Sequence, residues 1–232
     1  MEAGWKSGES SIHAVIFDLD GVLVDSSEFH FEAWKAWAEE VGLADRVTRQ
    51  WFRATFGRRN PDVFNTLYDT DPSEDEMRRQ SDRKEQIFRE RASGRLEPLE
   101  GARELVASLH EAGVRLALGT SAPRENATMM IEELRLASFF DARVTGDDVT
   151  TGKPDPEVFL KAAERLDVPP QRCLVIEDAA AGVDAAHNAG MAAVAVATEP
   201  TPGHRRADLV VASLAELDVA TIADLIERTG AR

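Results

Sequence analysis

Two aspartates, Asp18 and Asp20, stand two residues apart directly after a short apolar run. Gly21 follows them and allows the backbone to turn sharply. A carboxylate at such a turn can act as a nucleophile, as a proton donor or acceptor, or as a ligand of a hard metal ion. An acidic surface turn has the same composition, so the pair alone leaves both interpretations open.

Three further groups of polar residues follow apolar runs in the same way. Thr120 and Ser121 come after VRLALG, where hydroxyls and helix N-terminal N–H groups can surround an anion. Lys153 stands in the loop GKPDP, whose prolines stiffen the backbone and can aim the ammonium inward. Glu177 and Asp178 follow CLVI. Each group also has an ordinary interpretation, as a helix cap or a solvated surface charge.

The order of these four groups along the chain is more specific than any one of them. An acid pair, a hydroxyl pair, a lysine and a second acid pair follow successive apolar runs. The carboxyl ends of parallel strands meet at one edge of a sheet, which is where open α/β sheets bind ligands. Surface turns would rarely produce this series, so the sequence predicts one shared site.

The elements needed to position these groups can be predicted from the apolar pattern. We expect strands at His13–Phe17, Val114–Gly119, Ala142–Thr145, Cys173–Ile176, Ala192–Ala197 and Leu209–Val211. We expect helices at Glu100–Ala112, from Pro123 onward and at Ala179–Ala189, the first and last closed by Gly113 and Gly190. This alternation predicts an α/β fold, with a Rossmann-like parallel sheet covered by helices on both faces.

Residues 27–97 have a different pattern, in which strand signals disappear. An apolar stripe at helical spacing runs through Phe31, Trp34, Ala38 and Val41 and ends at Gly42. A second helix begins at the capping-box pair Ser73 and Glu76 and continues to about Ala92. The segment therefore predicts a group of helices inserted after the first strand.

This insertion gives the predicted domain organisation. We expect a Rossmann-like catalytic core at residues 12–26 and 98–232 and a small helical cap domain at residues 27–97. The chain must cross between them twice, near Asp25–Ser27 and near Leu96–Leu99. Both crossings are candidate hinges.

Composition limits the partners. The chain has 42 acidic and 27 basic residues and a formal net charge of −15, which disfavours nucleic acid and anionic membrane surfaces. A small phosphorylated metabolite remains compatible, because local cations and N–H groups can hold it. One cysteine, no apolar run of about 18 residues and no apolar signal-peptide core predict a cytoplasmic protein. The four tryptophans are expected to pack the cap rather than an interface, so we expect a monomer or weak dimer.

Four segments together resemble the haloacid dehalogenase superfamily. They are FDLDGVLVDS at 17–26, the Thr120-Ser121 pair, GKPDPEVF at 152–159 and IEDAAAGVDAAHNAGM at 176–191. The resemblance covers about residues 13–197 and extends to the β-phosphoglucomutase-like branch. Members of that branch carry a helical cap after the first strand, which agrees with the pattern described above.

The resemblance implies a role for each carboxylate. Asp18 matches the nucleophile, which forms an aspartyl-phosphate, and Asp20 matches the acid/base. A Mg²⁺ cofactor would be held by the Asp18 carboxylate, the Asp20 backbone carbonyl and Asp178, with Glu177 acting directly or through water.

The resemblance also implies which residues bind the substrate. Thr120 and Lys153 would hold the non-bridging phosphate oxygens, with Ser121 beside them. His30 and Lys84 match positions of the sugar-phosphate mutase pattern in the cap, and His30 could orient Asp20. A histidine that simply lies on a helix near the hinge is an equally good interpretation of His30.

The same comparison separates a phosphatase from a mutase. The mutase pattern has an arginine where this chain has Asn60, and a serine-lysine pair in place of Ala122-Pro123. Arg58, Arg59 or Arg124 could replace these anchors for a second phosphate, and Arg59 is our candidate.

We therefore predict a Mg²⁺-dependent phosphatase acting on a small sugar phosphate or related metabolite. The alternatives are a β-phosphoglucomutase-type mutase and a non-catalytic relative. The sequence specifies neither the substrate nor the position of the cap.

Overall fold

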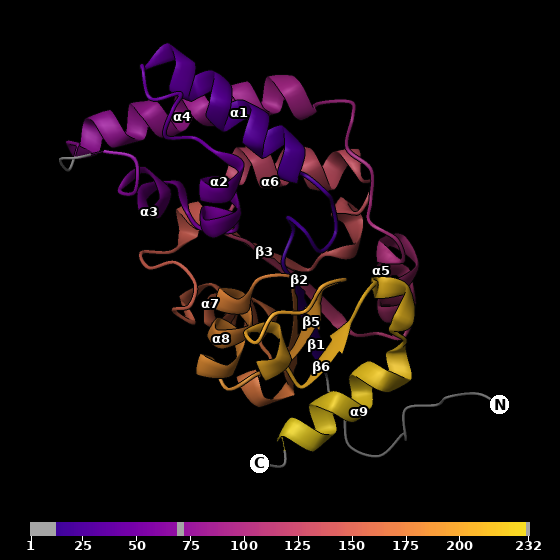
Figure 1. Cartoon of the computed structure of the whole chain (residues 1–232). Coiled ribbons are helices and arrows are strands. Elements are labelled where there is room, and N and C mark those ends of the chain that lie inside the picture. The colour runs from indigo at the N-terminus through magenta and orange to yellow at the C-terminus, as the bar shows by residue number, and fades with distance from the viewer. Residues whose placement is uncertain (1–12, 69–71, 231–232) are drawn as a thin grey trace.

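The computed structural model describes residues 13–68 and 72–230, and its centre is a parallel sheet (Figure 1). The strands are β1 (Ala14–Phe17), β2 (Arg115–Gly119), β3 (Ala142–Val144), β4 (Cys173–Glu177), β5 (Ala192–Val196) and β6 (Leu209–Val211). Their order is β3-β2-β1-β4-β5-β6, so β1 is central and pairs in parallel with β2 and β4. The order reverses at β1, which makes its carboxyl end a topological switch point. The predicted α/β class with a parallel sheet is confirmed.

Nine α-helices accompany the sheet in the described residues. They are α1 (Ser27–Glu40), α2 (Arg49–Thr55), α3 (Asn60–Phe64), α4 (Glu74–Ala92), α5 (Ala102–Glu111), α6 (Arg124–Glu133), α7 (Glu157–Leu166), α8 (Ala180–Asn188) and α9 (Val219–Gly230). Short 3₁₀ helices lie at Ala137–Phe139, Gly146–Asp148, Pro170–Arg172, His204–Arg206 and Leu214–Glu216. None of the helices in the described ranges is long and apolar enough to cross a membrane.

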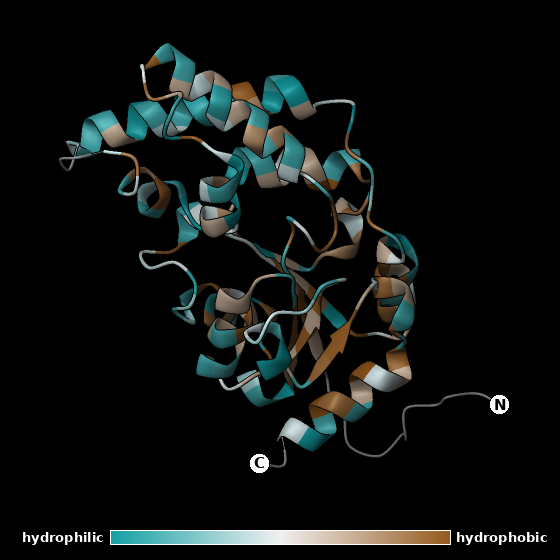
Figure 2. Ribbon diagram, viewed as in Figure 1, coloured by the Kyte–Doolittle hydropathy of each residue, from teal (hydrophilic) through white to brown (hydrophobic). Residues whose placement is uncertain are grey.

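Alternate residues of the strands bury against different helices, because successive side chains of a strand point to opposite faces. In β1, Val15 and Phe17 belong to the apolar cluster that includes α5, α6 and α9, whereas Ala14 and Ile16 belong to the cluster that includes α7 and α8. Figure 2 shows the strands as an apolar layer inside more polar helices. Both faces of the sheet are thus covered, as predicted.

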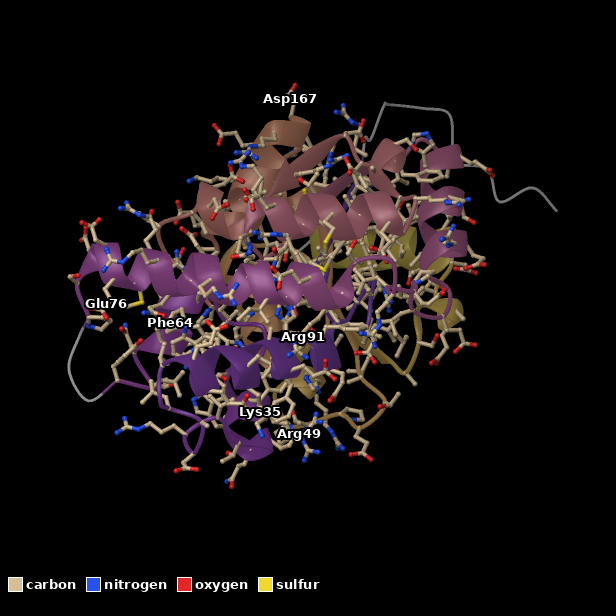
Figure 3. All side chains as sticks on the ribbon, turned by 90° about the horizontal axis from the view of Figure 1, so that it is seen from above. Lys35, Arg49, Phe64, Glu76, Arg91 and Asp167 are labelled. Carbon is tan, nitrogen blue, oxygen red and sulfur yellow. The ribbon has the colours of Figure 1, made fainter. Side chains whose placement is uncertain are left out.

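The helices α1 to α4 form a layer beside the carboxyl ends of the strands, and we call residues 27–97 the helical insertion. Helix α4 lies between α1 and α6 (Figures 1 and 3). The rings of Trp34 and Trp37 contact each other, and Phe64 contacts both at centroid distances of 5.0 and 4.9 Å. Trp51 also contacts Trp34, so three of the four tryptophans pack here, while Trp5 lies outside the described residues.

The two crossings into the helical insertion lie side by side. Val24 and Pro98 form an antiparallel bridge, and the Leu99 N–H donates to the Leu23 carbonyl at 3.0 Å. One apolar cluster continues from the sheet residue Phe17 into the insertion. The division into core and cap domains and the hinge function of the crossings therefore remain predictions.

Cys173, the one cysteine of the chain, begins β4 and is only 1% exposed. Burial raises the pKa of its thiol to about 12. The thiolate is the reactive form of cysteine, so this side chain is an inert part of the core.

Candidate active site

The turn after β1 brings the two acid pairs into contact. The Asp18 N–H donates to the Ile176 carbonyl at 3.0 Å, which extends the pairing of β1 with β4 by one residue. Gly21 then turns the chain with a φ of 78°. A Cβ atom on Gly21 would lie 2.0 Å from an Asp178 carboxylate oxygen, so only glycine fits. The Asp18 loop is thereby held against the end of β4.

Three carboxylates and one lysine meet at this point. Oxygens of Asp18, Glu177 and Asp178 lie within 4.8 Å of one another. Lys153 donates from Nζ to Asp18 Oδ1 at 2.8 Å and forms a second short contact with Glu177. Its side chain is 5% exposed, so the ammonium points inward as the sequence indicates. The fold therefore brings four of the predicted site residues together.

The electrostatics of this group show an excess of negative charge. Burial raises the pKa of Asp18 to about 7 despite the Lys153 ammonium, and Glu177 adds to the rise. Burial and the charges of Glu177 and Asp18 raise the pKa of Asp178 well above its ordinary value. Burial alone would lower the pKa of Lys153, but the two carboxylates it contacts raise it. One lysine does not balance three carboxylates, of which Asp18 and Glu177 are buried and Asp178 is partly exposed, and their oxygens fit a hard divalent cation.

The hydroxyl pair lies at the end of the neighbouring strand β2. Thr120 is 1% exposed, and its Oγ1 accepts a hydrogen bond from the Ala122 N–H at 3.1 Å. The hydroxyl proton of Thr120 remains available for an anion. Ser121 is partly exposed and lines a cavity of about 50 Å³ together with Asp20.

Asp20 is buried and already accepts hydrogen bonds. Ser26 donates its hydroxyl to Asp20 Oδ1, and His30 Nε2 lies 3.3 Å from the same oxygen. Burial acts to raise the pKa of Asp20, but the hydrogen bond from His30, the Ser26 hydroxyl and the charge of Lys84 lower it below its usual range. Asp20 is therefore held as a carboxylate at neutral pH.

Lys84 contacts the His30 ring on its Nδ1 side, opposite the Nε2 that faces Asp20, and fixes its orientation. Its Nζ is 2.8 Å from His30 Nδ1 and donates to Glu85 Oε1 at 2.9 Å. An ammonium can only donate, so Nδ1 accepts and Nε2 carries the proton that points to Asp20. The ring of Phe88 stacks on His30 at 3.8 Å between centroids. His30 therefore lies where it can orient Asp20, and its role in substrate binding remains a prediction.

Arg59 and Asn60 of the helical insertion contact other protein groups. Arg59 Nη1 donates to the Val149 carbonyl at 3.1 Å, and its Nε lies 3.5 Å from Asp62. Asn60 donates to Glu85 at 2.7 Å. Both Lys84 and Arg58 line the cavity, but Arg59 does not border it. The substrate-binding roles of Arg59 and Lys84 remain predictions.

Sequence reasoning missed three buried residues of this network: Ser26, Glu85 and Asn126. Ser26 ends the motif that contains Asp18 and Asp20, so its place in that segment was an available signal. Glu85 is adjacent to Lys84, but a charged helix gives no sign of its burial. Nothing in the sequence near Asn126 indicates that it contacts the helical insertion.

The chain matches known proteins over most of its length. The family model for haloacid dehalogenase-like hydrolases matches residues 15–196. A phosphorylated carbohydrates phosphatase of Thermotoga maritima is 36% identical over 182 residues, which are 78% of this chain and 82% of that protein. A β-phosphoglucomutase of Bacillus subtilis is 35% identical over 215 residues, or 88% of this chain and 91% of the relative.

The fold of a solved relative agrees with these matches. The crystal structure of β-phosphoglucomutase from Clostridium difficile superposes on this chain with a TM-score of 0.84 and 28% sequence identity. The match covers 95% of this chain and 100% of the other. The site residues at the ends of β1, β2 and β4 lie within the matched range. The chain belongs to the haloacid dehalogenase-like hydrolases.

Proposed function

We propose that this protein is a Mg²⁺-dependent phosphatase that hydrolyses small sugar phosphates or related metabolites through an aspartyl-phosphate on Asp18. The observation that carries the proposal is the position of Asp18 at the end of the central strand, in contact with Lys153 and beside Asp178. A phosphate ester resists attack because its oxygens are anionic, and catalysis must align the reactants and offset charge. This arrangement supports both requirements.

The proposed reaction has two steps. A carboxylate oxygen of Asp18 attacks phosphorus, the bond from phosphorus to the leaving oxygen breaks, and Asp20 gives its proton to that oxygen. Asp20 then removes a proton from water, and the resulting hydroxide attacks phosphorus and releases Asp18 and inorganic phosphate. Thr120 and Lys153 hold the non-bridging oxygens throughout.

Asp20 suits both of its roles in this scheme. His30 and Ser26 keep it ionised before substrate binds, which is the form that accepts a proton. A bound phosphate adds negative charge nearby and favours protonation of the carboxylate, which is the form needed for the leaving group.

The donor set supports Mg²⁺ as the cofactor. Asp18, Asp178 and the Asp20 backbone carbonyl would hold the ion, with Glu177 acting directly or through water, and these hard oxygen donors suit it. Bound there, Mg²⁺ would neutralise charge on the carboxylates and the phosphate oxygens. Lys153 supplies the remaining positive charge.

Hydrolysis is favoured over mutase chemistry by the positions that would bind a second phosphate. Asn60 is engaged by Glu85, and Ala122 and Pro123 carry no charge. Arg124 is 62% exposed and pairs with Asp148 at 2.9 Å.

A β-phosphoglucomutase-type mutase is the second candidate. It is supported by the exposed Arg58 at the cavity and by the match to the enzyme from Bacillus subtilis.

The space around Asp20 supports a small substrate. The cavity of about 50 Å³ borders Asp20, and an open hollow of about 1050 Å³ lies between α4 and the core; Ser121 and Asn60 border both. The open hollow has room for a small organic group such as a sugar. The name of the Thermotoga maritima relative, a phosphatase of phosphorylated carbohydrates, agrees with this class.

A panel of phosphorylated metabolites tests the proposal. Phosphate release and isomerisation of β-glucose 1-phosphate are measured with Mg²⁺ and with EDTA, using the wild type and Asp18→Asn. We expect Mg²⁺-dependent phosphate release that EDTA and the substitution each abolish. Isomerisation without release would instead establish the mutase, and activity that survives EDTA would exclude the proposed metal.

We also propose that the partners are small molecules alone and that the protein is a monomer or weak dimer in the cytoplasm. The net charge of −15 argues against nucleic acid and anionic membranes as partners. Light scattering after gel filtration is expected to give a mass near the chain mass of 25.5 kDa. A stable larger assembly would contradict this.

A further inference from the structure

We propose that Asn126 of α6 and Glu85 of α4 act as a positioning pair, which holds Lys84 and His30 so that His30 presents its proton to Asp20. The proposal rests on the proposed function through the acid/base role of Asp20. Neither residue touches the reacting groups in this arrangement, so both would act through the side chains between them.

Asn126 is one of the core side chains that contact α4, and its neighbour Glu125 also pairs with Arg89 at 2.9 Å. Its side chain is fully buried, and its amide donates from Nδ2 to Glu85 Oε2. Its Oδ1 accepts from Arg89 Nη1 at 2.8 Å. Glu85 and Arg89 are one helical turn apart, and the carboxylate and guanidinium together fix which end of the amide faces each. One core side chain therefore contacts two residues of the helical insertion.

Glu85 in turn holds the Lys84 ammonium through a hydrogen bond. Its Oε1 accepts from Lys84 at 2.9 Å and from Asn60 at 2.7 Å, while Oε2 accepts from Asn126. Glu85 is 4% exposed and Lys84 is 1% exposed. Removing either charge would leave the other buried without its partner, which is costly in a protein interior. The carboxylate thus fixes where the Lys84 ammonium lies.

The chain of contacts then ends at Asp20. Lys84 Nζ lies 2.8 Å from His30 Nδ1 and donates a hydrogen bond to it. Nδ1 must therefore be the unprotonated ring nitrogen. The proton must be on Nε2, 3.3 Å from Asp20 Oδ1. If Asn126 released Glu85, the ammonium could move away and His30 could adopt either neutral tautomer. Docking of α4 on α6 is therefore coupled to the side chain that we propose protonates the leaving group.

The substitution Asn126→Asp tests this coupling with almost no change in shape. The new carboxylate cannot donate to Glu85 and repels it, although it can still accept from Arg89. We expect imidazole ¹⁵N NMR of the wild type to show His30 as a single tautomer protonated at Nε2, and the variant to show a mixture. Identical His30 signals in both proteins would overturn the proposal without any measurement of activity.

The kinetic test compares two esters, glucose 6-phosphate and p-nitrophenyl phosphate. An alkoxide is a poor leaving group and needs a proton, whereas p-nitrophenolate does not. We expect Asn126→Asp to lower kcat/KM on glucose 6-phosphate by about 10- to 100-fold and on p-nitrophenyl phosphate by less than about 3-fold. An equal loss on both esters would mean that Asn126 is merely structural.

A second variant and a control complete the test. In Asn126→Asp with Glu85→Gln, the donor and acceptor are exchanged: the amide at position 85 can still accept from Lys84, and the one negative charge moves to position 126 within the same network. We therefore expect recovery of both the single tautomer and the activity on glucose 6-phosphate. Asn65→Asp makes the same chemical change at an exposed position of the helical insertion and is expected to behave as wild type. Failure of the exchange to restore either signal would count against the pair. A wild type that turns over no ester of the metabolite panel would refute the proposed function, whereas the NMR result separately decides the contact chain.

Discussion

At the scale of single residues, the site is built around unequal charges. Asp18, Glu177 and Asp178 share one lysine, and burial makes their negative charge expensive in the absence of a cation. Such an arrangement lowers the stability of the metal-free protein, because the carboxylates that form the ligand set repel one another before a cation binds. Function and stability therefore oppose each other at Asp18.

The pH dependence of unfolding should expose this opposition. The folded pKa of Asp18 is about 7 against an ordinary value of 3.8, so the folded state retains the proton more strongly. Its contribution to the free energy of unfolding is full below about pH 4 and is lost as the pH rises to about 7. In EDTA, we expect urea unfolding to show a weaker decline for Asp18→Asn than for the wild type over this range.

The exposed substitution Asp45→Asn is the matched control for that experiment, and its profile should follow the wild type. Added Mg²⁺ should stabilise the wild type at pH 7.5 more than Asp18→Asn. Equal pH profiles for all three proteins would show that Asp18 carries no such penalty.

Replacing Lys153 should have two opposite effects. Lys153→Met removes the cation that contacts Asp18 and Glu177, so we expect kcat/KM for phosphate release to fall by about 10²- to 10⁴-fold. The remaining carboxylates then have a greater deficit of positive charge, so Mg²⁺ should raise Tm more than in the wild type. Lys35→Met, on the exposed face of α1 (Figure 3), should change neither quantity.

At the scale of elements, the helical insertion depends on aromatic packing. Phe64 of α3 is fully buried between Trp34 and Trp37. Helix α3 has only five residues, which is too short to be stable without tertiary contacts. The helices around it should therefore be held in place largely by this one side chain.

The substitution Phe64→Ala should lower the free energy of unfolding by about 3–5 kcal/mol, because it removes buried apolar contacts and leaves a cavity. Leu160→Ala, at a side chain that is 39% exposed, should change it by less than about 1 kcal/mol. Both values can be measured by urea unfolding. Similar small losses for the two variants would show that the aromatic cluster is not a source of stability.

The same elements explain what the sequence could predict. The six strands and the core helices α5, α6 and α8 have local apolar patterns, and their predicted positions agree with the structure to within a few residues, whereas no bounds were predicted for α7 and α9. The fifth helix begins at Ala102 rather than Glu100, because Gly101 before it has a φ of 82° and packs against Ala215. The short helices α2 and α3 were not predicted individually, because tertiary packing stabilises them more than local propensity does.

The candidate site divides in the same way. Asp18, Lys153 and Asp178 could be predicted because each follows a strand end, and parallel strands bring those ends together. The contact of Asn126 with Glu85 joins two helices that are remote in sequence, and helical periodicity carries no information about such a pair. Buried polar partners across an interface emerge only from the packed structure.

At the scale of the whole molecule, the helical insertion and the core share one apolar cluster. The sheet residue Phe17 and the insertion residue Phe31 both belong to it. A continuous cluster favours cooperative unfolding of both parts, even if they are separate domains by sequence.

Unfolding followed by two signals tests this cooperativity. Tryptophan fluorescence reports chiefly on the insertion, where Trp34, Trp37 and Trp51 lie, and far-UV circular dichroism reports on the whole chain. We expect the two thermal transitions to coincide. A fluorescence transition at lower temperature would show that the insertion unfolds alone and would favour two independent domains.

The buried thiol of Cys173 makes the protein convenient for site-directed labelling. Cysteines introduced at the exposed positions Lys35 on α1 and Glu164 on α7 would take maleimide dyes, while the native thiol would stay unlabelled in the folded state. Energy transfer between the dyes would then follow the separation of insertion and core during turnover. A residue with no part in the chemistry thus leaves the wild-type background free for single-molecule spectroscopy.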